Sequence, residues 1–156
     1  MNEVRRLFLK ASMATGTIAL AAGAGLLTPR AVMAAWPKAA FESKSLNEAI
    51  KLSNGSSSTT NSKDITLEVP DIAENGAVVS VTVKSKLPNT EKITVLVAEN
   101  ERPLAASYVL GKRTGGFVTS RVKMRKTSDV IAVVKAGNQL YSVKKPVKVT
   151  LGGCGG

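Results

Sequence analysis

The chain has 156 residues, of which 44% are hydrophobic and only 4% aromatic, and its 22 basic residues outnumber the 11 acidic ones. This length allows one domain of ordinary size beside any targeting segment. The sequence contains no histidine and a single cysteine, Cys154. These counts exclude Ser-His-Asp and Cys-His catalytic sites, zinc-type metal centres and an internal disulfide bond. We therefore expect no catalytic residue, no metal site and no bound cofactor in this chain.

The first 34 residues have the pattern of an export signal. Arg5 and Arg6 precede an apolar run from residue 11 to residue 27, and Ala34 supplies a small residue before the expected cleavage site. The arginine pair resembles a twin-arginine signal, although Val4 stands where that pattern usually has Ser or Thr. A membrane anchor is the alternative, but the apolar run is short for a spanning helix and is interrupted by polar residues and glycine. We expect residues 1–34 to be removed, which leaves a domain outside the cytoplasm with no membrane attachment.

Two short segments precede the predicted strands. Ser45 and Glu48 form a capping-box pattern before apolar residues at helical spacing, so a short helix is predicted over residues 45–52. The polar run 53–62 has low complexity and too few apolar residues to bury, which predicts a linker or mobile loop.

From Ile65 onward, apolar and polar residues alternate with a period of two, as in strands with one buried face. Residues 130–134 are apolar throughout, which predicts a strand that is buried on both faces. The predicted strands cover residues 65–69, 79–83, 93–97, 104–110, 118–124, 130–134 and 140–151. About seven short strands separated by turn residues predict an all-β fold, an immunoglobulin-like β-sandwich that lacks the Cys and Trp hallmarks of antibody domains.

Most basic residues lie on the polar faces of the predicted strands, but residues 121–126 contain four of them: Arg121, Lys123, Arg125 and Lys126. A solvated strand face is the simplest interpretation of this run. A docking surface for acidic partners or small anions is the alternative. The scarcity of aromatic residues and the export signal argue against nucleic-acid binding.

The chemistry of the chain is concentrated at its C-terminus, which reads Gly152-Gly153-Cys154-Gly155-Gly156. Because glycine hardly restricts φ, we expect residues 152–156 to form a flexible arm with an exposed thiol. A mobile thiol without an activating neighbour is suited to carrying a covalently attached group between enzymes. An intermolecular disulfide and an incidental tail remain open, whereas prenylation would require the cysteine one position earlier.

This terminal motif, behind Lys148-Val149-Thr150, resembles the SoxY family, the sulfur-carrier subunits of the bacterial Sox thiosulfate-oxidising system. Residues 70–76 (Pro-Asp-Ile-Ala-Glu-Asn-Gly), the Arg102-Pro103-Leu104 step and residues 121–124 leading to Thr127-Ser128 also match. Two departures concern partner docking: Val78-Val79-Ser80 stands where a proline-containing stretch is expected, and Arg125-Lys126 makes a strand end unusually basic.

The resemblance implies a non-catalytic periplasmic subunit that pairs with SoxZ, a second small β-sandwich protein. It implies that the c-type haem enzyme SoxAX joins thiosulfate oxidatively to the sulfur of Cys154, and that the manganese hydrolase SoxB then releases sulfate. In some organisms the molybdenum enzyme SoxCD oxidises the remaining persulfide sulfur. Cys154 is then the attachment point, and every cofactor belongs to a partner enzyme. The glycines that form the slim arm are Gly152, Gly153, Gly155 and Gly156. The alternative is an exported structural or adhesion β-sandwich that dimerises through a Cys154 disulfide.

Overall fold

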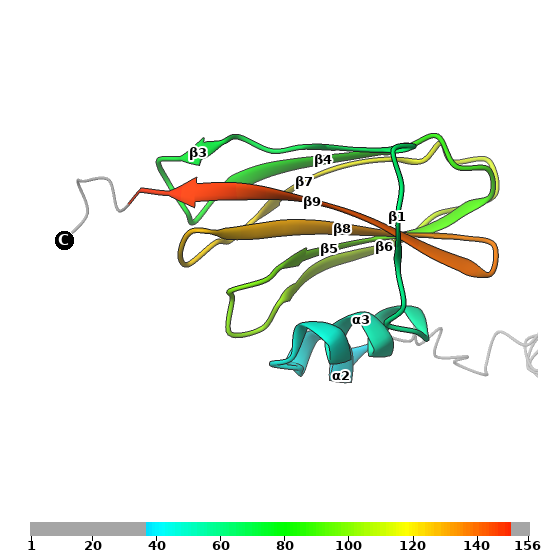
Figure 1. Cartoon of the computed structure of the whole chain (residues 1–156), viewed down its shortest axis with the longest axis horizontal. Coiled ribbons are helices and arrows are strands. Elements are labelled where there is room, and N and C mark those ends of the chain that lie inside the picture. The colour runs from blue at the N-terminus through cyan, green and yellow to red at the C-terminus, as the bar shows by residue number, and fades with distance from the viewer. Residues whose placement is uncertain (1–36, 151–156) are drawn as a thin grey trace, which may run out of the picture. The chain divides into compact units, whose positions relative to one another are not determined.

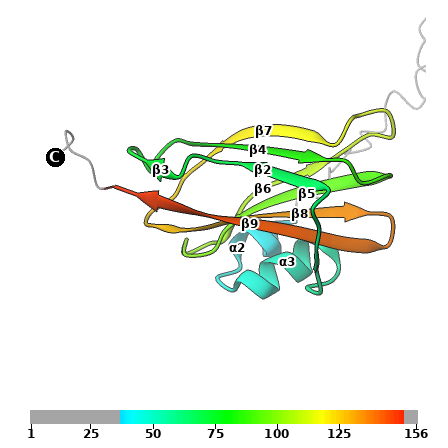
Figure 2. The same ribbon diagram turned by 45° about the horizontal axis from the view of Figure 1, so that its top comes forward.

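The computed structural model describes residues 37–150. In this part of the chain two short helices precede nine strands, and the strands form two sheets that face each other (Figure 1). Both helices lie against the outer face of the larger sheet (Figure 2). The described domain therefore has three layers, and the predicted immunoglobulin-like β-sandwich with a helix at its N-terminal side is confirmed.

The larger sheet has the strand order β1-β9-β8-β5-β6, with β3 also paired to β9, and the smaller sheet has the order β2-β4-β7. In the described chain, β1 and β3 pair with β9 in parallel, and the other pairings are antiparallel. The elements are α2 (Lys38–Glu42), α3 (Leu46–Asn54), β1 (Thr60–Asn61), β2 (Ile65–Glu68), β3 (Ile72–Ala73), β4 (Val79–Ser85), β5 (Thr90–Val97), β6 (Leu104–Val109), β7 (Phe117–Val122), β8 (Ser128–Ala136) and β9 (Gln139–Val149).

The core between the sheets consists mainly of valine. Because side chains alternate across a strand, every second residue of β4 points into the sandwich, where β-branched side chains pack well on the pleated surface. Val79, Val81 and Val83 are at most 1% exposed. Residues of β2, β5, β7 and β8 close this core from the other sides: Ile65, Leu67, Ile93, Val95, Val97, Val118, Val122, Val130, Ala132 and Val134.

A second, smaller core lies under the helices. Val133 on β8 and Leu96 on β5 are fully buried there against Ala49 and Ile50 of α3. Val130, Ala132 and Val134 face the sandwich core, on the side of β8 opposite to Val133. The strand β8 is therefore buried on both faces. The prediction for residues 130–134 is therefore confirmed.

The predicted cap of α3 is confirmed, because the Ser45 side chain accepts a hydrogen bond from the Glu48 backbone N–H at 3.4 Å. The capping box is only half formed. The Glu48 carboxylate accepts from the Ser43 hydroxyl at 2.8 Å, and the Ser45 N–H donates to Ser43 Oγ at 3.2 Å. The helix runs to Asn54 and ends at Gly55, whose φ of 86° is in the left-handed region that favours glycine.

The interpretation of residues 53–62 as a linker or loop is wrong at both ends of the segment. Ser53 and Asn54 belong to α3, and the Ser53 side chain is buried. Thr60 and Asn61 form β1, which pairs with Tyr141 and neighbouring residues of β9. Such a polar segment can join a sheet edge because the pairing uses backbone groups and buries little side-chain area.

The predicted seven strands all exist, but β1 and β3 were not expected. Each has two residues, too few for a period of two to be visible. The helix α2 was also not expected, because its five residues are too few to show a helical pattern of apolar residues. Among residues 37–150, no helix has the length and hydropathy needed to cross a bilayer.

Candidate functional site: the end of the sandwich that leads to Cys154

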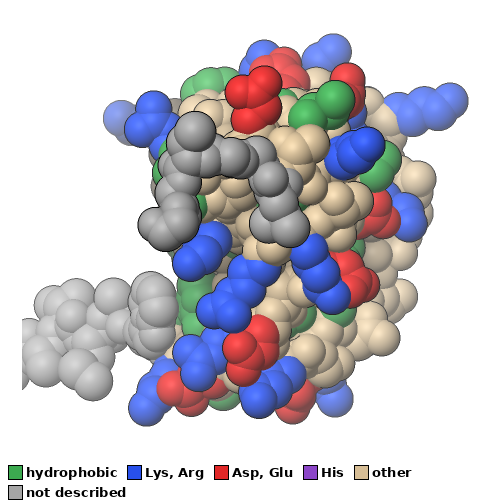
Figure 3. Space-filling view, turned by 90° about the vertical axis from the view of Figure 1, so that its left-hand side faces the viewer, with side chains coloured by type: hydrophobic (Ala, Val, Ile, Leu, Met, Phe, Trp, Pro, Cys, Tyr) green, Lys and Arg blue, Asp and Glu red, His purple; other side chains and the backbone are tan. Residues whose placement is uncertain are grey.

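The predicted attachment residue Cys154, the four arm glycines and the signal residues Arg5 and Arg6 all lie outside the described residues. The structure does describe where the chain leaves the sandwich toward Cys154. That point is Thr150, directly after β9. We call this region the exit end; it comprises the end of β9 and the loops 74–78, 98–103 and 123–127. Figure 3 views the molecule from this end.

The strand β3 holds the last residues of β9 on one side. The register pairs Ile72 with Lys148 and Ala73 with Val149. The Thr150 N–H donates to the Ala73 carbonyl oxygen at 3.1 Å. This parallel pairing fixes the path of the backbone up to Thr150.

Thr127, in the β7–β8 loop, holds the end of β9 on the other side. The Thr127 hydroxyl accepts a hydrogen bond from the Val149 N–H at 3.0 Å and lies 3.4 Å from the Val149 carbonyl oxygen, to which it donates. The Thr127 side chain thus bonds both the N–H and the carbonyl oxygen of Val149. On the opposite edge of β9, the backbone of Ala73 pairs with Val149. The backbone at the end of β9 is therefore held in place by two separate segments.

Gly76 allows the β3–β4 turn to pack against both of these elements. The Met124 N–H donates to the Gly76 carbonyl oxygen at 2.7 Å, and Asn75 Oδ1 accepts from the Ala77 N–H at 2.9 Å. A Cβ atom on Gly76 would overlap the Met124 carbonyl oxygen and would lie 2.9 Å from Val149 Cγ1. This close approach explains why the turn at Asn75-Gly76 needs glycine at its second position.

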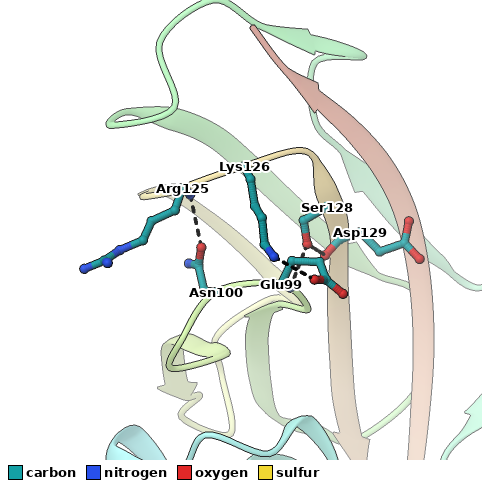
Figure 4. Close-up of polar contacts among 6 residues, drawn as sticks. All are labelled: Glu99, Asn100, Arg125, Lys126, Ser128 and Asp129. Carbon is teal, nitrogen blue, oxygen red and sulfur yellow. Dashed lines mark hydrogen bonds and ion pairs between the residues drawn. The ribbon is translucent and has the colours of Figure 1, made fainter. Parts of the chain in front are cut away.

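The β7–β8 loop is also bonded to the β5–β6 loop through one amide side chain (Figure 4). Asn100 Nδ2 donates to the Lys123 carbonyl oxygen at 2.7 Å, and Asn100 Oδ1 accepts from the Arg125 N–H at 3.1 Å. Nearby, the buried Ser128 hydroxyl accepts from the Glu99 N–H at 2.9 Å. The backbone of loop 123–127 is therefore fixed by its neighbours, while its basic side chains point into solvent.

The charges of this loop are only partly neutralised. Lys126 forms an ion pair with Glu99 at 3.1 Å, and Arg125 forms a longer one with Glu101 at 4.0 Å. Within residues 37–150, no carboxylate oxygen lies within 4.0 Å of the charged nitrogens of Arg121 or Lys123. Figure 3 shows Lys and Arg side chains gathered over this end, with a few acidic side chains between them.

The described part of the exit end has no donor set for a metal. Over residues 37–150, no group of three or more histidine, cysteine, aspartate or glutamate side chains is placed to hold an ion. The polar side chains there are hydroxyl, amide and basic groups together with the carboxylates of Glu74, Glu99 and Glu101. This arrangement can position a chain end and present positive charge.

Sequence reasoning singled out the basic run but not the residues that fix it. Thr127 and Ala73 stood in segments that matched the family resemblance, without assigned roles, and Asn100 was not selected at all. Their roles depend on backbone groups of other loops. A hydrogen bond between a side chain and the backbone of a residue far away in the sequence produces no periodic pattern in the sequence. These contacts could therefore be identified only from the structure.

Comparison with known proteins agrees with the fold and with the terminal motif. The model of the family "Sulfur oxidation protein SoxY" matches residues 50–154, a range that ends at Cys154. The solved structure of the sulfur carrier protein SoxY from Chlorobium limicola f thiosulfatophilum is 38% identical, with a TM-score of 0.62, and the match covers 68% of this chain and 96% of that chain.

A lytic polysaccharide monooxygenase from Jonesia denitrificans aligns over 67% of this chain and 68% of its own, with 18% identity and a TM-score of 0.38. The search of curated proteins finds no match. The family match covers more than half of the chain, and the SoxY structure shares both sequence and fold with it. The chain therefore belongs to the SoxY family of sulfur oxidation proteins.

Proposed function

We propose that this chain is a sulfur carrier that holds thiosulfate-derived sulfur covalently on the thiol of Cys154. The observation that supports this most is the contrast between the exit end and the residues beyond Thr150. The backbone is bonded on both sides up to Thr150, and the sequence then supplies a cysteine between two glycine pairs. The family match extends as far as that cysteine.

The geometry gives the thiol a limited reach from a fixed point. Cys154 is the fourth residue after Thr150, which corresponds to a reach of at most about 13–14 Å when the backbone is extended. That distance is enough to place the sulfur inside a pocket of another protein while the sandwich stays at the rim. The chain itself supplies no histidine to activate the thiol, so activation comes from the partner's active site.

The loading step is an oxidation. A bond forms between Cys154 Sγ and the outer sulfur of thiosulfate, the thiol proton is released, and two electrons pass to the c-type haem enzyme SoxAX. Hydrolysis by the manganese enzyme SoxB then consumes one water, breaks the bond between the two thiosulfate-derived sulfur atoms, releases sulfate and leaves a persulfide on Cys154. The carrier supplies the attachment atom and no catalytic group.

The remaining parts of the proposal concern location and partners. The chain is exported by the twin-arginine route, loses residues 1–34 and works in the periplasm as a heterodimer with SoxZ. Where SoxCD is present, that molybdenum enzyme oxidises the persulfide sulfur before the final hydrolysis. Haem, manganese and molybdenum belong to these enzymes, and this chain binds none of them.

The test is a reconstitution with thiosulfate, SoxAX, an oxidised c-type cytochrome as electron acceptor, and the mature chain paired with SoxZ. The expected result is a mass increase equal to one thiosulfate, reversed by a thiol reductant, in the wild-type chain only. Cys154→Ser is the matched control, because it changes one atom of the side chain and should fold normally. A wild-type chain that forms only a disulfide dimer would favour the structural or adhesion alternative.

A further inference from the structure

We infer that Arg121, Lys123 and Arg125 form a docking surface for an acidic protein surface that borders the pocket entered by the C-terminal residues. This inference rests on the proposed carrier function and adds to it the surface through which the sandwich meets its enzymes. The partner is identified by its chemistry, as a protein with carboxylates around a pocket mouth.

The position of these residues is the first argument. Arg121 is near the end of β7, and Lys123 and Arg125 follow it in the loop that also contains Thr127, whose hydroxyl bonds the N–H and the carbonyl oxygen of Val149. Cys154 lies five residues beyond Val149, or at most about 16–18 Å of extended chain. A protein that takes Cys154 into a pocket therefore brings the mouth of that pocket close to loop 123–127.

The exposure and the charge of the loop are the second argument. Val122 and Met124 are buried, and Arg121, Lys123 and Arg125 alternate with them and are exposed. The Arg125 side chain is 64% exposed, and its ion pair with Glu101 is long, at 4.0 Å. Three basic groups on consecutive outward positions produce a local positive potential that complements an acidic surface.

The fixed backbone of the loop is the third argument. Asn100 bonds both the Lys123 carbonyl oxygen and the Arg125 N–H, and the Met124 N–H bonds Gly76. Little backbone entropy is therefore lost when a partner contacts these side chains, which favours docking by preformed surfaces.

An acidic protein surface fits these residues better than a small anion does. The three side chains are exposed and alternate along one backbone, so each interacts with an anion mainly through water, where a single contact between charges is weak. Many such contacts act together only on an extended surface of opposite charge. Opposite charges on the two proteins mainly increase the rate of association, and salt screens this effect.

The test compares two charge-reversal variants with the same change in net charge. Lys123→Glu/Arg125→Glu alters the proposed surface. Lys112→Glu/Arg113→Glu alters two exposed basic residues in the β6–β7 loop, at the opposite end of these strands, and is the matched control. Each mature chain, paired with SoxZ, is the varied substrate for thiosulfate loading by SoxAX, with an oxidised c-type cytochrome as the acceptor of the two electrons and thermal melting as the check of folding.

For Lys123→Glu/Arg125→Glu we expect kcat/KM for the carrier to fall about tenfold at low ionic strength, and the gap to close as salt is raised. The control variant should load like the wild type. Equal effects of the two variants would overturn the docking surface, while thiosulfate loading of the wild type would still support the carrier function. A rise only in the KM for thiosulfate would assign the residues to a small anion and would also overturn the inference. If the wild type accepts no sulfur at all, the carrier function itself fails, and the docking surface fails with it.

Discussion

The hydroxyl of Thr127 bonds both backbone groups of Val149, at 3.0 Å to the N–H and 3.4 Å to the carbonyl oxygen. Val149 is the last residue of β9, and its other neighbour in the sheet is Ala73 of β3. A residue of the β7–β8 loop thereby fixes the end of the last strand before Cys154. The carrier arm, in our account, starts from a point that the domain holds on both sides.

Replacing Thr127 by valine should loosen this point without changing the size of the side chain. The variant loses two hydrogen bonds at an exposed position, so we expect a decrease of about 1–2 kcal/mol in the free energy of unfolding. Amide hydrogen exchange should become faster at Val149 and Thr150. Thr127→Ser keeps the hydroxyl and should exchange like the wild type; equal protection in all three proteins would show that Thr127 does not hold β9.

Gly76→Ala should destabilise the domain more than its single methyl group suggests. The new Cβ would overlap the Met124 carbonyl oxygen and approach Val149 Cγ1, and backbone cannot move aside as a flexible side chain can. We expect a loss of about 1–3 kcal/mol, measured by denaturant unfolding.

Gly115→Ala is the matched control for Gly76→Ala, because a Cβ at Gly115 meets no atom within 4 Å. This control should be as stable as the wild type or slightly more stable, since alanine restricts the unfolded chain. If both variants unfold at the same denaturant concentration, the close packing of Gly76 is not important for the exit end.

Lys92 should make the stability of the domain depend on pH in the alkaline range. Its ammonium donates to the Ser53 carbonyl oxygen at the end of α3, and burial, together with the charge of Lys135, lowers the pKa of Lys92 below its usual 10.5. Between the lowered pKa and 10.5 the unfolded chain binds more protons than the folded chain. The free energy of unfolding therefore rises with pH across that window, and this contribution is constant below it.

The pH effect of Lys92 is measured as a difference between the wild type and Lys92→Gln, so that other titrating groups cancel. We expect the stability of the wild type relative to the variant to increase as the pH is raised from neutral toward 10.5. A difference that stays constant with pH would mean that the environment of Lys92 does not disfavour its charged form.

Gly153→Val and Gly155→Val should slow sulfur transfer and leave the sandwich intact. A β-branched side chain beside Cys154 stiffens the backbone and widens the segment that must enter a narrow pocket. Thiosulfate loading, followed by mass, should become slower in both variants, and Tm should equal that of the wild type. A large decrease in Tm would indicate that these residues pack against the domain, contrary to the proposal.

The β-sandwich could be predicted because its core residues alternate with polar residues within single strands, as the valines of β4 do. Val79, Val81 and Val83 point to one face in any register that buries them, and the Ser45 cap depends on a residue three positions away. Thr94 departs from the same alternation. It is fully buried beneath α3 and donates to Asn54 Oδ1 at 3.1 Å, a contact that the strand pattern alone does not contain.

The exit end could be predicted only in part. Cys154 stands out as a lone thiol between glycines, and Gly76 stands out as the second residue of an Asn-Gly turn. The pairing of β3 with β9 has only two residue pairs, and the partners are 76 positions apart in the sequence. The Asn100 side chain joins its own loop to backbone atoms of the β7–β8 loop. Such contacts depend on the complete fold, because residues of these types are also common at solvent-exposed positions and the sequence does not show which partner they meet.

The most direct test of the carrier function is the intact mass of the mature chain from the periplasm of thiosulfate-fed cells, measured with and without a reducing agent. Our account predicts reducible additions of about one sulfur atom or one thiosulfate, and peptide mapping should place them on the last five residues, which include Cys154. A chain that carries only a free thiol, or only a plain disulfide to a second copy, would contradict the carrier function.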